Sequence, residues 1–432
     1  MYGIRCGYMI KRILLSVFLL QLAVLLFVPS LYAQTPGENL TLKISVNGPG
    51  GQLWSYWGHI ALVIENKRTG DNRFYDYGLF SFRNTDFFYN FAFGRLWFSC
   101  GDSPAESNIA NYISINRGVK IYTLDVPPEN RVKVRNFVED NVLPENSEYF
   151  YHHFWDNCST RIRDIIDLAT DGQFKEKYGE APGRFTLRQH VRRHTWFNPP
   201  ADWFLNFLMG QDIDKPLTVW DEMFLPSEVG KRIAEFMYTG PDGVSHPLVT
   251  DVEVVYQAVG RSEVRETPRM QWPRQLAFGI AIALLLGFFY FLQTKSRVGY
   301  ILVGMSHSII GLFFGIVSLA LYFMSLFTDH DYTYHNMNMI FASPLLLAAV
   351  PLGIKYAFPP FLKAREQADF LLRLLWMLVV LGIFVSMLLK LLPWFWQANL
   401  VDQMLMLPIA LVFAFEPLGF RELLGRVFWR WF

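Results

Sequence analysis

The sequence predicts an α+β domain exported from the cytoplasm, followed by an all-α bundle of five transmembrane helices. Residues 1–33 have the pattern of an export signal, residues 35–270 have the mixed composition of a soluble domain, and residues 275–432 are mostly apolar. The limits that follow are a signal peptide over 1–33, an exported domain over 34–260, a linker over 261–274 and a transmembrane region over 275–432. The net charge of +1 gives no reason to expect a nucleic-acid partner.

The N-terminus begins with basic residues and continues with the apolar run ILLSVFLLQLAVLLFV. Small residues then offer a cleavage site after Ala33, which is typical of a secretory signal peptide. An uncleaved membrane anchor is the alternative. Both interpretations place the following domain outside the cytoplasm.

Segments rich in Ile, Val, Phe and Tyr, bounded by Gly, Asn or Pro, predict the strands of the exported domain. They are 40–47, 59–65, 73–80, 94–99, 118–126 and the late segment PLVTDVEVVYQ. Helical patterns occur in PPENRVKVRNFVEDNVL, in 159–169, after a cap at Thr186, in PPADWFLNFLMG and in SEVGKRIAEFM. Strands followed by helices indicate an α+β domain.

Five apolar stretches approach the roughly 20 residues that a helix needs to cross a bilayer. They are 276–293, 299–327, 337–357, 370–392 and 400–416. The basic loops at 295–297, 355–365 and 421–432 would then share one side, while the two intervening loops contain no Lys or Arg. This charge pattern predicts a bacterial inner-membrane protein with a cytoplasmic C-terminus and a periplasmic domain. His307, inside the second stretch, is expected to form a hydrogen bond to a neighbouring helix.

One of the three cysteines lies where a helix should begin. Asp156 and Asn157 are good capping residues, so Cys158 would occupy the first turn, where the helix dipole favours a thiolate. The apolar positions that follow fall on one helical face, which we expect to pack on the sheet: Ile162, Ile165, Ile166 and Ala169.

A thiolate nucleophile needs a base within hydrogen-bonding reach. His59 begins a predicted buried strand, and the next strand would pair with it as a hairpin. Asp76 or Tyr77 on that second strand could then orient the imidazole of His59. The sequence therefore indicates a dyad of Cys158 and His59, with Asp76 as a third member.

Three alternatives remain open at this point. Cys100 could form a disulfide with Cys158 in an oxidising compartment, which would remove the nucleophile. His59 could be a buried structural histidine. Zinc binding by His152, His153 and Cys158 lacks the usual ligand spacing and a fourth ligand, so we expect neither a metal nor another cofactor.

Several motifs together resemble those of a known family. WSYWGHIALVIE, FYDYGLF, GRLWF, FWDNCSTRIRDIID, MFLPSEV and HNMNMIFASP are similar to segments of the Lnb-type lipoprotein N-acyltransferases of Bacteroidota. The exported domain also resembles the circularly permuted papain-like group (NlpC/P60-like and LRAT-like), in which a strand histidine precedes a cysteine at a helix start. The resemblance covers about residues 40 to 350.

This resemblance implies an acyltransferase. A phospholipid would donate an acyl chain to Cys158 as a thioester, with His59 as the base, and the acceptor would be the N-terminal amine of a diacylated lipoprotein. Asp76 stands where the family often has Asn, which makes its orienting role less secure. The side chains that we expect around the substrate are Trp57, Tyr77, His153, Asn157, His335 and Asn338.

Two other functions compete with acyl transfer. A periplasmic cysteine peptidase or amidase acting on cell-wall peptides could use the same dyad with water. A non-catalytic membrane assembly protein could be stapled by a disulfide between Cys100 and Cys158. The apolar half favours a lipid substrate, because a soluble hydrolase does not need five spans.

Overall fold

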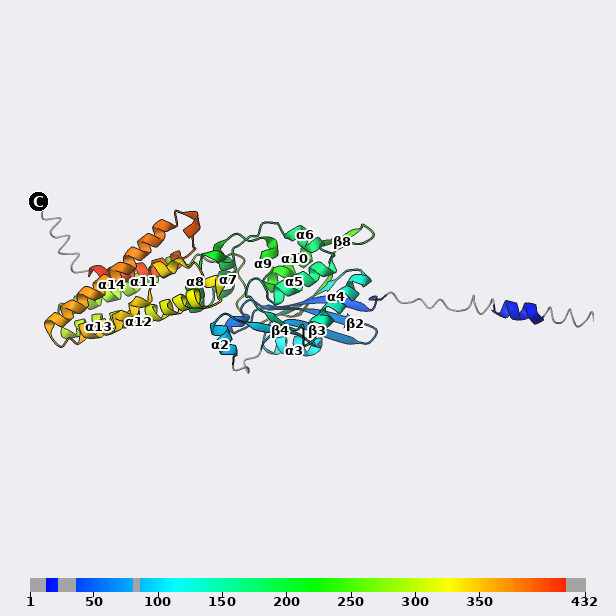
Figure 1. Cartoon of the computed structure of the whole chain (residues 1–432), viewed down its shortest axis with the longest axis horizontal. Helices are drawn as coiled ribbons and strands as arrows, with labels where there is room; N and C mark the ends of the chain where they lie inside the picture. The colour runs from blue at the N-terminus through cyan, green and yellow to red at the C-terminus, as the bar shows by residue number, and fades with distance from the viewer. Residues whose placement is uncertain (1–12, 22–35, 81–85, 417–432) are drawn as a thin grey trace, which may run out of the picture.

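The computed structural model describes residues 13–21, 36–80 and 86–416. Residues 13–21 are helical, whereas the proposed cleavage site at Ala33 and the basic segment 421–432 lie outside the described residues. Figure 1 shows an α/β body joined to an elongated helical bundle. The α+β prediction for the exported half and the helical prediction for the C-terminal half are therefore both confirmed.

The exported domain is built on a seven-stranded antiparallel sheet with the order β6-β4-β3-β2-β1-β5-β9. These strands are β1 (Leu40–Asn47), β2 (His59–Asn66), β3 (Asp71–Leu79), β4 (Trp97–Pro104), β5 (Val119–Leu124), β6 (Glu148–Phe150) and β9 (Val249–Tyr256). A separate hairpin pairs β7 (Met237–Thr239) with β8 (Ser245–Pro247). The first residue of β2, His59, pairs with Asn47 of β1, whereas the pairing of β2 with β3 begins three residues later, at Leu62.

Helices cover both faces of this sheet (Figure 1). The helices α4 (Pro128–Asn141), α5 (Cys158–Ala169) and α10 (Pro226–Glu235) pack on one face, whereas α3 (Ala105–Ser114) packs on the other. A hydrophobic core lies on each face of the sheet. Alternate residues of β2 pack into one core or the other, because successive side chains of a strand point to opposite faces. The predicted packing of α5 through Ile162, Ile165, Ile166 and Ala169 is confirmed, since all four are buried in the same core as β2.

The smaller helices of the exported domain are α2 (Phe87–Ala92), α6 (Gln173–Tyr178), α7 (Leu187–Thr195), α8 (Pro199–Leu208) and α9 (Val219–Glu222). The sequence did not indicate α3, because its segment AESNIANYIS buries only Ala105 and Tyr112. The fourth predicted strand begins three residues later than expected, at Trp97. Thr186 caps α7 as predicted, accepting a hydrogen bond from the Gln189 amide.

In the described part of the chain, three helices are long and apolar enough to cross a membrane. They are α11 (Trp272–Gln293), α12 (Arg297–Phe327) and α14 (Leu362–Leu389). Two shorter apolar helices accompany them, Pro344–Ala357, which ends in α13 (Ala349–Ala357), and α15 (Leu400–Phe415). The predicted span 337–357 is not one continuous helix, because the side chains of Asn336 and Ser343 cap short turns that interrupt it.

Small residues and one histidine hold the bundle together. A Cβ on Gly304 would lie 2.4 Å from the Gly353 carbonyl oxygen, so α12 and α13 approach backbone to backbone. His307 is 1% exposed and hydrogen-bonds Tyr290 on α11 and Trp376 on α14 at 3.2 and 2.9 Å. The predicted hydrogen bond from His307 to a neighbouring helix is therefore confirmed.

The two loops without Lys or Arg both contact the exported domain. Asn336 and Asn338 donate their side-chain amides to the Phe207 carbonyl at 3.0 and 2.9 Å. Gln397, in the other loop, donates to the Met209 carbonyl at 3.1 Å. The same end of the bundle thus carries both loops and the exported domain.

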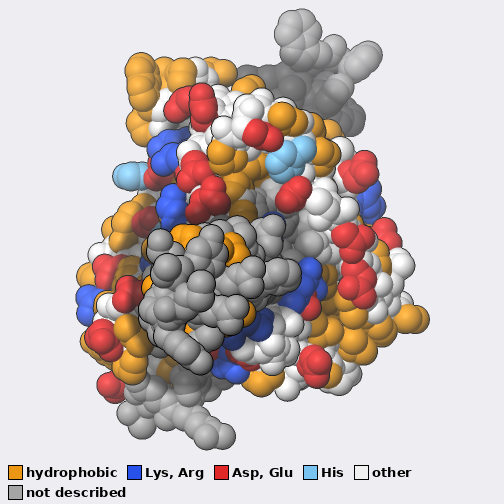
Figure 2. All heavy atoms as spheres, turned by 90° about the vertical axis from the view of Figure 1, so that its right-hand side faces the viewer, with side chains coloured by type: hydrophobic (Ala, Val, Ile, Leu, Met, Phe, Trp, Pro, Cys, Tyr) orange, Lys and Arg blue, Asp and Glu red, His pale blue; other side chains and the backbone are white. Residues whose placement is uncertain are grey.

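The opposite end of the exported domain has a different surface. Figure 2 shows Lys and Arg side chains interspersed there with Asp and Glu, with scattered hydrophobic side chains between them. A surface with both signs of charge is typical of a face in water.

Candidate active site

His59 and Asp76 form a hydrogen-bonded pair at the end of the sheet. The pair joins His59 Nε2 to Asp76 Oδ1 at 2.8 Å, and each side chain is 14% exposed. A carboxylate only accepts, so Nε2 carries the proton and Nδ1 is left for another partner. Gly78 makes room for the ring, because a Cβ there would lie 2.5 Å from His59 Cε1.

The charges of this pair reinforce each other. Burial opposes the charged imidazole, but the charges of Asp76, Tyr112 and Cys158 together with the hydrogen bond to Asp76 outweigh it, and the pKa of His59 is raised well above its ordinary value. Burial likewise opposes the charged carboxylate of Asp76, yet His59 and the Gly78 amide, which donates at 2.7 Å, leave the pKa of Asp76 lowered. Both shifts favour the charged forms of the two side chains.

Cys158 is the first residue of α5, and Asn157 caps that helix. The Asn157 side-chain oxygen accepts from the amides of Ser159 and Thr160 at 2.8 and 3.0 Å, which confirms the predicted cap. Cys158 is partly exposed and packs against the core that α5 shares with the sheet. Its sulfur thus lies at a helix N-terminus that is not closed off from solvent.

The cysteine lies within electrostatic reach of the His59 pair. After burial and the larger contributions of Asp76 and Tyr112, the charge of Cys158 also raises the pKa of His59. The predicted disulfide alternative is not formed, because both Cys100 and Cys158 are free thiols. Cys100 is buried and donates its thiol to the Asn141 carbonyl at 2.8 Å, and burial raises its pKa.

Two further side chains surround the pair and were not indicated by the sequence. The ring of Tyr112 lies 6.2 Å from that of His59, and the Arg117 guanidinium lies 4.9 Å above the Tyr112 ring. Arg117 is 8% exposed and donates to the Gly48 carbonyl at 2.8 Å. No local motif marks these residues, since only the folded sheet brings α3 and the start of β5 beside β2.

Three of the side chains expected around the substrate are instead buried and form hydrogen bonds within the protein. Tyr77 is 1% exposed and donates its hydroxyl to Asn141 in the core. Asn157 is 4% exposed, and its two amide hydrogens go to the carbonyls of His153 and Phe224. Asn338 is fully buried between Phe207 and the bundle. These residues position the site rather than face a ligand.

The other three remain accessible. Trp57 is half-buried beside Tyr56, and His153 is exposed, with its ring 5.5 Å from that of Tyr332. His335 has a side chain that is 68% exposed and an ion pair with Asp212 at 2.7 Å. Tyr332 and His335 belong to the loop that follows α12, so this loop borders the exported domain on the side of His153.

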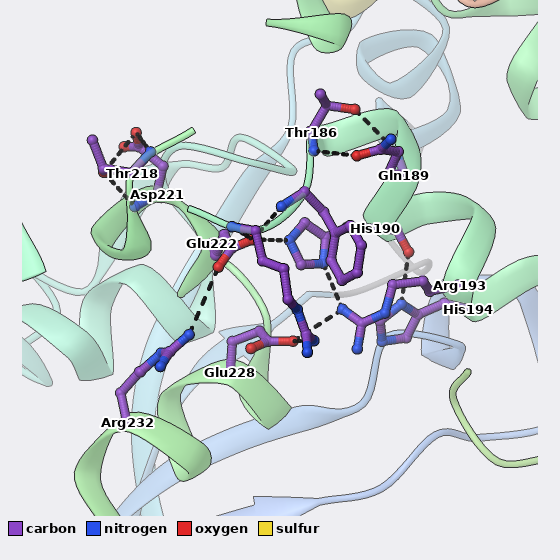
Figure 3. A network of polar contacts seen from close by, with 12 residues as sticks. Thr186, Gln189, His190, Arg193, His194, Thr218, Asp221, Glu222, Glu228 and Arg232 are labelled. Carbon is purple, nitrogen blue, oxygen red and sulfur yellow. Dashed lines mark hydrogen bonds and ion pairs between the residues drawn. The ribbon is translucent and has the colours of Figure 1, made fainter. Parts of the chain in front are cut away.

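A buried polar network supports the turn that receives Asn157 (Figure 3). Glu222 accepts from the backbone amides of Arg184 and Phe185 at 2.7 Å and from His190 Nε2 at 3.1 Å. The other nitrogen of His190 accepts from Arg193, which also donates to Glu228 at 3.0 Å. The network fixes the segment MFLPSEV, whose Phe224 carbonyl holds the cap of α5.

In the part of the chain that the structure describes, no group of three or more His, Cys, Asp or Glu side chains is placed to hold a metal ion. The site itself offers the thiol of Cys158, the imidazole of His59 and the carboxylate of Asp76.

Residues 28–193 match the family model described as the Lnb N-terminal periplasmic domain. This range contains His59, Asp76 and Cys158, and the match confirms the resemblance drawn from the motifs. No curated protein and no solved structure matches the chain. The match ends at Arg193, before the apolar helices begin, so it gives no information about how these helices are arranged.

Proposed function

The chain carries an Lnb N-terminal periplasmic domain, and from this premise we propose that it is a membrane-bound acyltransferase of lipoprotein biogenesis. A phospholipid would be the acyl donor, and the N-terminal amine of a diacylated lipoprotein would be the acceptor. The match and the fold support a periplasmic domain of a lipoprotein-processing family joined to apolar helices.

One observation carries the proposed chemistry: a histidine bonded to a carboxylate, in electrostatic contact with a cysteine at a helix start. We assign Cys158 as the nucleophile, His59 as the proton carrier and Asp76 as the group that orients and stabilises the imidazolium. Nε2 of His59 is engaged by Asp76, which leaves Nδ1 to exchange a proton with the sulfur.

The first half-reaction forms a thioester. In the starting state, the thiol proton of Cys158 resides on His59. The sulfur attacks the ester carbonyl of the phospholipid, the ester C–O bond breaks, and the departing glycerol oxygen takes the proton from His59. A lysophospholipid leaves, and Cys158 carries the acyl chain.

The second half-reaction restores the enzyme. The lipoprotein amine attacks the thioester carbonyl, the C–S bond breaks, and the amine proton passes to His59. The products are an amide on the lipoprotein and the original thiolate–imidazolium pair. The backbone amide of Cys158 is the natural donor to the oxyanion of both tetrahedral intermediates.

The membrane half supports a lipid substrate. We propose that all five apolar segments cross the bilayer, with the C-terminus in the cytoplasm. The observation in favour is that both loops lacking Lys and Arg contact the exported domain at one end of the bundle. We propose a signal peptide over 1–33 and a catalytic domain over 34–260. A linker over 261–274 would then join this domain to the bundle over 275–432.

The order of the candidate catalytic residues along the chain gives an argument about the fold of the exported domain. A histidine on a strand precedes a cysteine at the start of a helix that packs on the same sheet. This order supports the proposal of a permuted papain-like fold. Among the accessible side chains, Trp57, His153 and His335 remain our proposed contacts to donor or acceptor.

The deciding experiment is mass spectrometry of lipoprotein N-termini in cells that carry Cys158→Ala or Cys100→Ala. We expect the first variant to lose the amide-linked acyl chain and the second to retain it, since Cys100 is buried in the core and free. Intact N-acylation with Cys158→Ala would overturn the proposal. Unchanged lipoproteins together with altered peptidoglycan would instead indicate a cell-wall peptidase or amidase.

A further inference from the structure

The short helix α2 is fastened to the outer end of α12. The Asp329 amide donates to the Phe93 carbonyl at 2.9 Å, and Arg95 pairs with the Asp329 carboxylate at 2.8 Å. A Cβ on Gly94 would lie 2.7 Å from the Asp329 carbonyl carbon, so only a glycine permits this approach. The ring of Phe93 also lies 5.7 Å from that of Phe323 on α12. These contacts hold α2 where α12 leaves the membrane.

The outward face of α2 is aromatic. Phe88, Tyr89 and Phe91 are 67%, 60% and 50% exposed, and on the last turn of α12 Leu326 and Phe327 are 60% and 68% exposed. Aromatic side chains are enriched where a protein meets the lipid headgroups. The far end of the domain, in contrast, presents mixed charges (Figure 2). The continuity of this patch with a candidate span identifies its occupant as the lipid of the outer leaflet.

A cleft of about 320 Å³ lies behind α2. Phe87 and Asn90 of α2 line one part of it, and Leu79, Phe98 and Ser99 of β3 and β4 line another. Its volume lies at the lower end of the range of small-molecule sites. Aromatic and aliphatic side chains make up about half of its lining and could contact a hydrocarbon chain, whereas Arg95 and Glu148 are charged and could face a phospholipid headgroup.

Two residues that line the cleft are neighbours of residues at the candidate active site. Leu79 follows Gly78, the residue against which the His59 ring packs. Phe98 stacks on Tyr151 with ring centroids 4.0 Å apart. Burial, and after it the charge of Cys158, raises the pKa of Tyr151, so this tyrosine lies within electrostatic reach of the sulfur.

We propose that α2 dips into the outer leaflet and that the cleft behind it guides one acyl chain of the donor phospholipid to Cys158. This inference rests on the proposed acyl transfer and adds the donor's path to it. The aromatic face anchors the domain at the lipid surface. The chain then passes between α2 and β4, with its ester end toward His59.

Ser99→Trp tests the path, because it places a large ring inside the cleft without touching the proposed catalytic groups. The matched control is Ser262→Trp, which fills a separate cavity of about 300 Å³ lined by glycines and Arg261. Full-length Cys158→Ala protein, alone and combined with each Trp change, is placed in phosphatidylethanolamine vesicles that carry a photoactivatable group on an acyl chain.

We expect cross-links to the residues that line the cleft within 79–80 and 87–99, reduced at least fivefold by Ser99→Trp and unchanged by Ser262→Trp. In otherwise wild-type protein, Ser99→Trp should also shorten the acyl chains found on lipoproteins. Thermal unfolding of each variant shows that it is folded. Cross-links confined to the bundle, or equal with folded Ser99→Trp, would overturn the path.

The two proposals fail separately. If Cys158→Ala cells still acylate lipoproteins, the proposed function fails whatever the cross-links show. If Cys158→Ala abolishes acylation but the cleft is not labelled, the proposed function stands and only the path fails.

Discussion

His59 in the exported domain and His307 in the bundle are both largely removed from water, but their partners differ. His59 bonds the charged carboxylate of Asp76 through Nε2, and its side chain is 14% exposed. His307 bonds the neutral Tyr290 and Trp376 and stacks on Phe413 at a ring distance of 3.9 Å.

The difference separates a proton carrier from a structural link. Indole N–H groups only donate, so Nδ1 of His307 accepts from Trp376 and its Nε2–H is directed to Tyr290. Both nitrogens are then occupied by neutral groups. At His59 the carboxylate favours the charged ring and one nitrogen remains for exchange, which is what acid–base chemistry requires.

The largest expected effect lies at the junction between the two regions. Arg188 is 1% exposed and donates to Asp214 and to the carbonyls of Asn206, Met209 and Gly210. Arg188→Ala leaves a buried carboxylate unpaired, and we expect a loss of about 3–5 kcal/mol in the free energy of unfolding. Thermal unfolding in detergent measures this loss.

The control for this prediction is Lys215→Ala, because the Lys215 side chain is 71% exposed in its ion pair with Asp212. Such a surface pair contributes at most about 1 kcal/mol. Equal shifts in the two variants would show that the junction does not depend on the buried arginine.

The second prediction concerns the charged pair of the exported domain. Asp76→Asn keeps a hydrogen-bonding group but removes the charge, so the pKa of His59 should fall. If the thiolate–imidazolium pair is the reactive form, the alkaline limb of the pH–rate profile moves to lower pH. We expect kcat/KM to fall about 10–100-fold, which corresponds to the roughly 1.5–3 kcal/mol of a charged hydrogen bond.

The same pair sets the sign of the pH dependence of stability. The folded pKa of His59 is raised, so its contribution is complete below about pH 6.5 and is lost as the pH rises through the folded pKa. Asp76, with a lowered pKa, contributes to stability above about pH 4 and loses this contribution as the pH falls further.

For the rate prediction, a pH–rate profile that is the same in Asp76→Asn as in the wild type would argue against a charged pair of Cys158 and His59.

The smallest effect is expected in the bundle. His307→Phe keeps a ring against Phe413 but leaves Tyr290 and Trp376 without their partner. Hydrogen bonds between membrane helices contribute about 0.6 kcal/mol on average, so we expect a loss of about 1–2 kcal/mol and a transfer rate within about twofold of wild type. A rate loss comparable to that of His59→Ala would instead place His307 in the chemistry.

Local sequence was sufficient for several parts of the site. Asn157 was predicted as a cap because Asn stabilises helix N-termini, and α5 was predicted to pack on the sheet because its apolar residues repeat on one face. His59 was predicted at a strand start from the glycine and the apolar run around it. These signals act over a few residues, which is why they can be recognised in the chain.

Other parts of the site could not be predicted from the sequence. Tyr77 and Asn338 are polar and lie in or near the motifs, so we expected them around the substrate, yet Tyr77 donates a hydrogen bond within the core and Asn338 links the exported domain to the bundle. Tyr112 and Arg117 carry no local signal, and they approach His59 only when α3 folds over the sheet.

By itself, the sequence determined the two-part architecture, the strand that carries His59 and the helix that begins at Cys158, since periodicity, capping and hydropathy depend on near neighbours. Only the tertiary structure decided that Asp76 rather than Tyr77 bonds His59, that Cys100 and Cys158 do not form a disulfide, and that the segment after α2 contacts Asp329. Those outcomes depend on residues distant in the chain, whose packing no local pattern encodes.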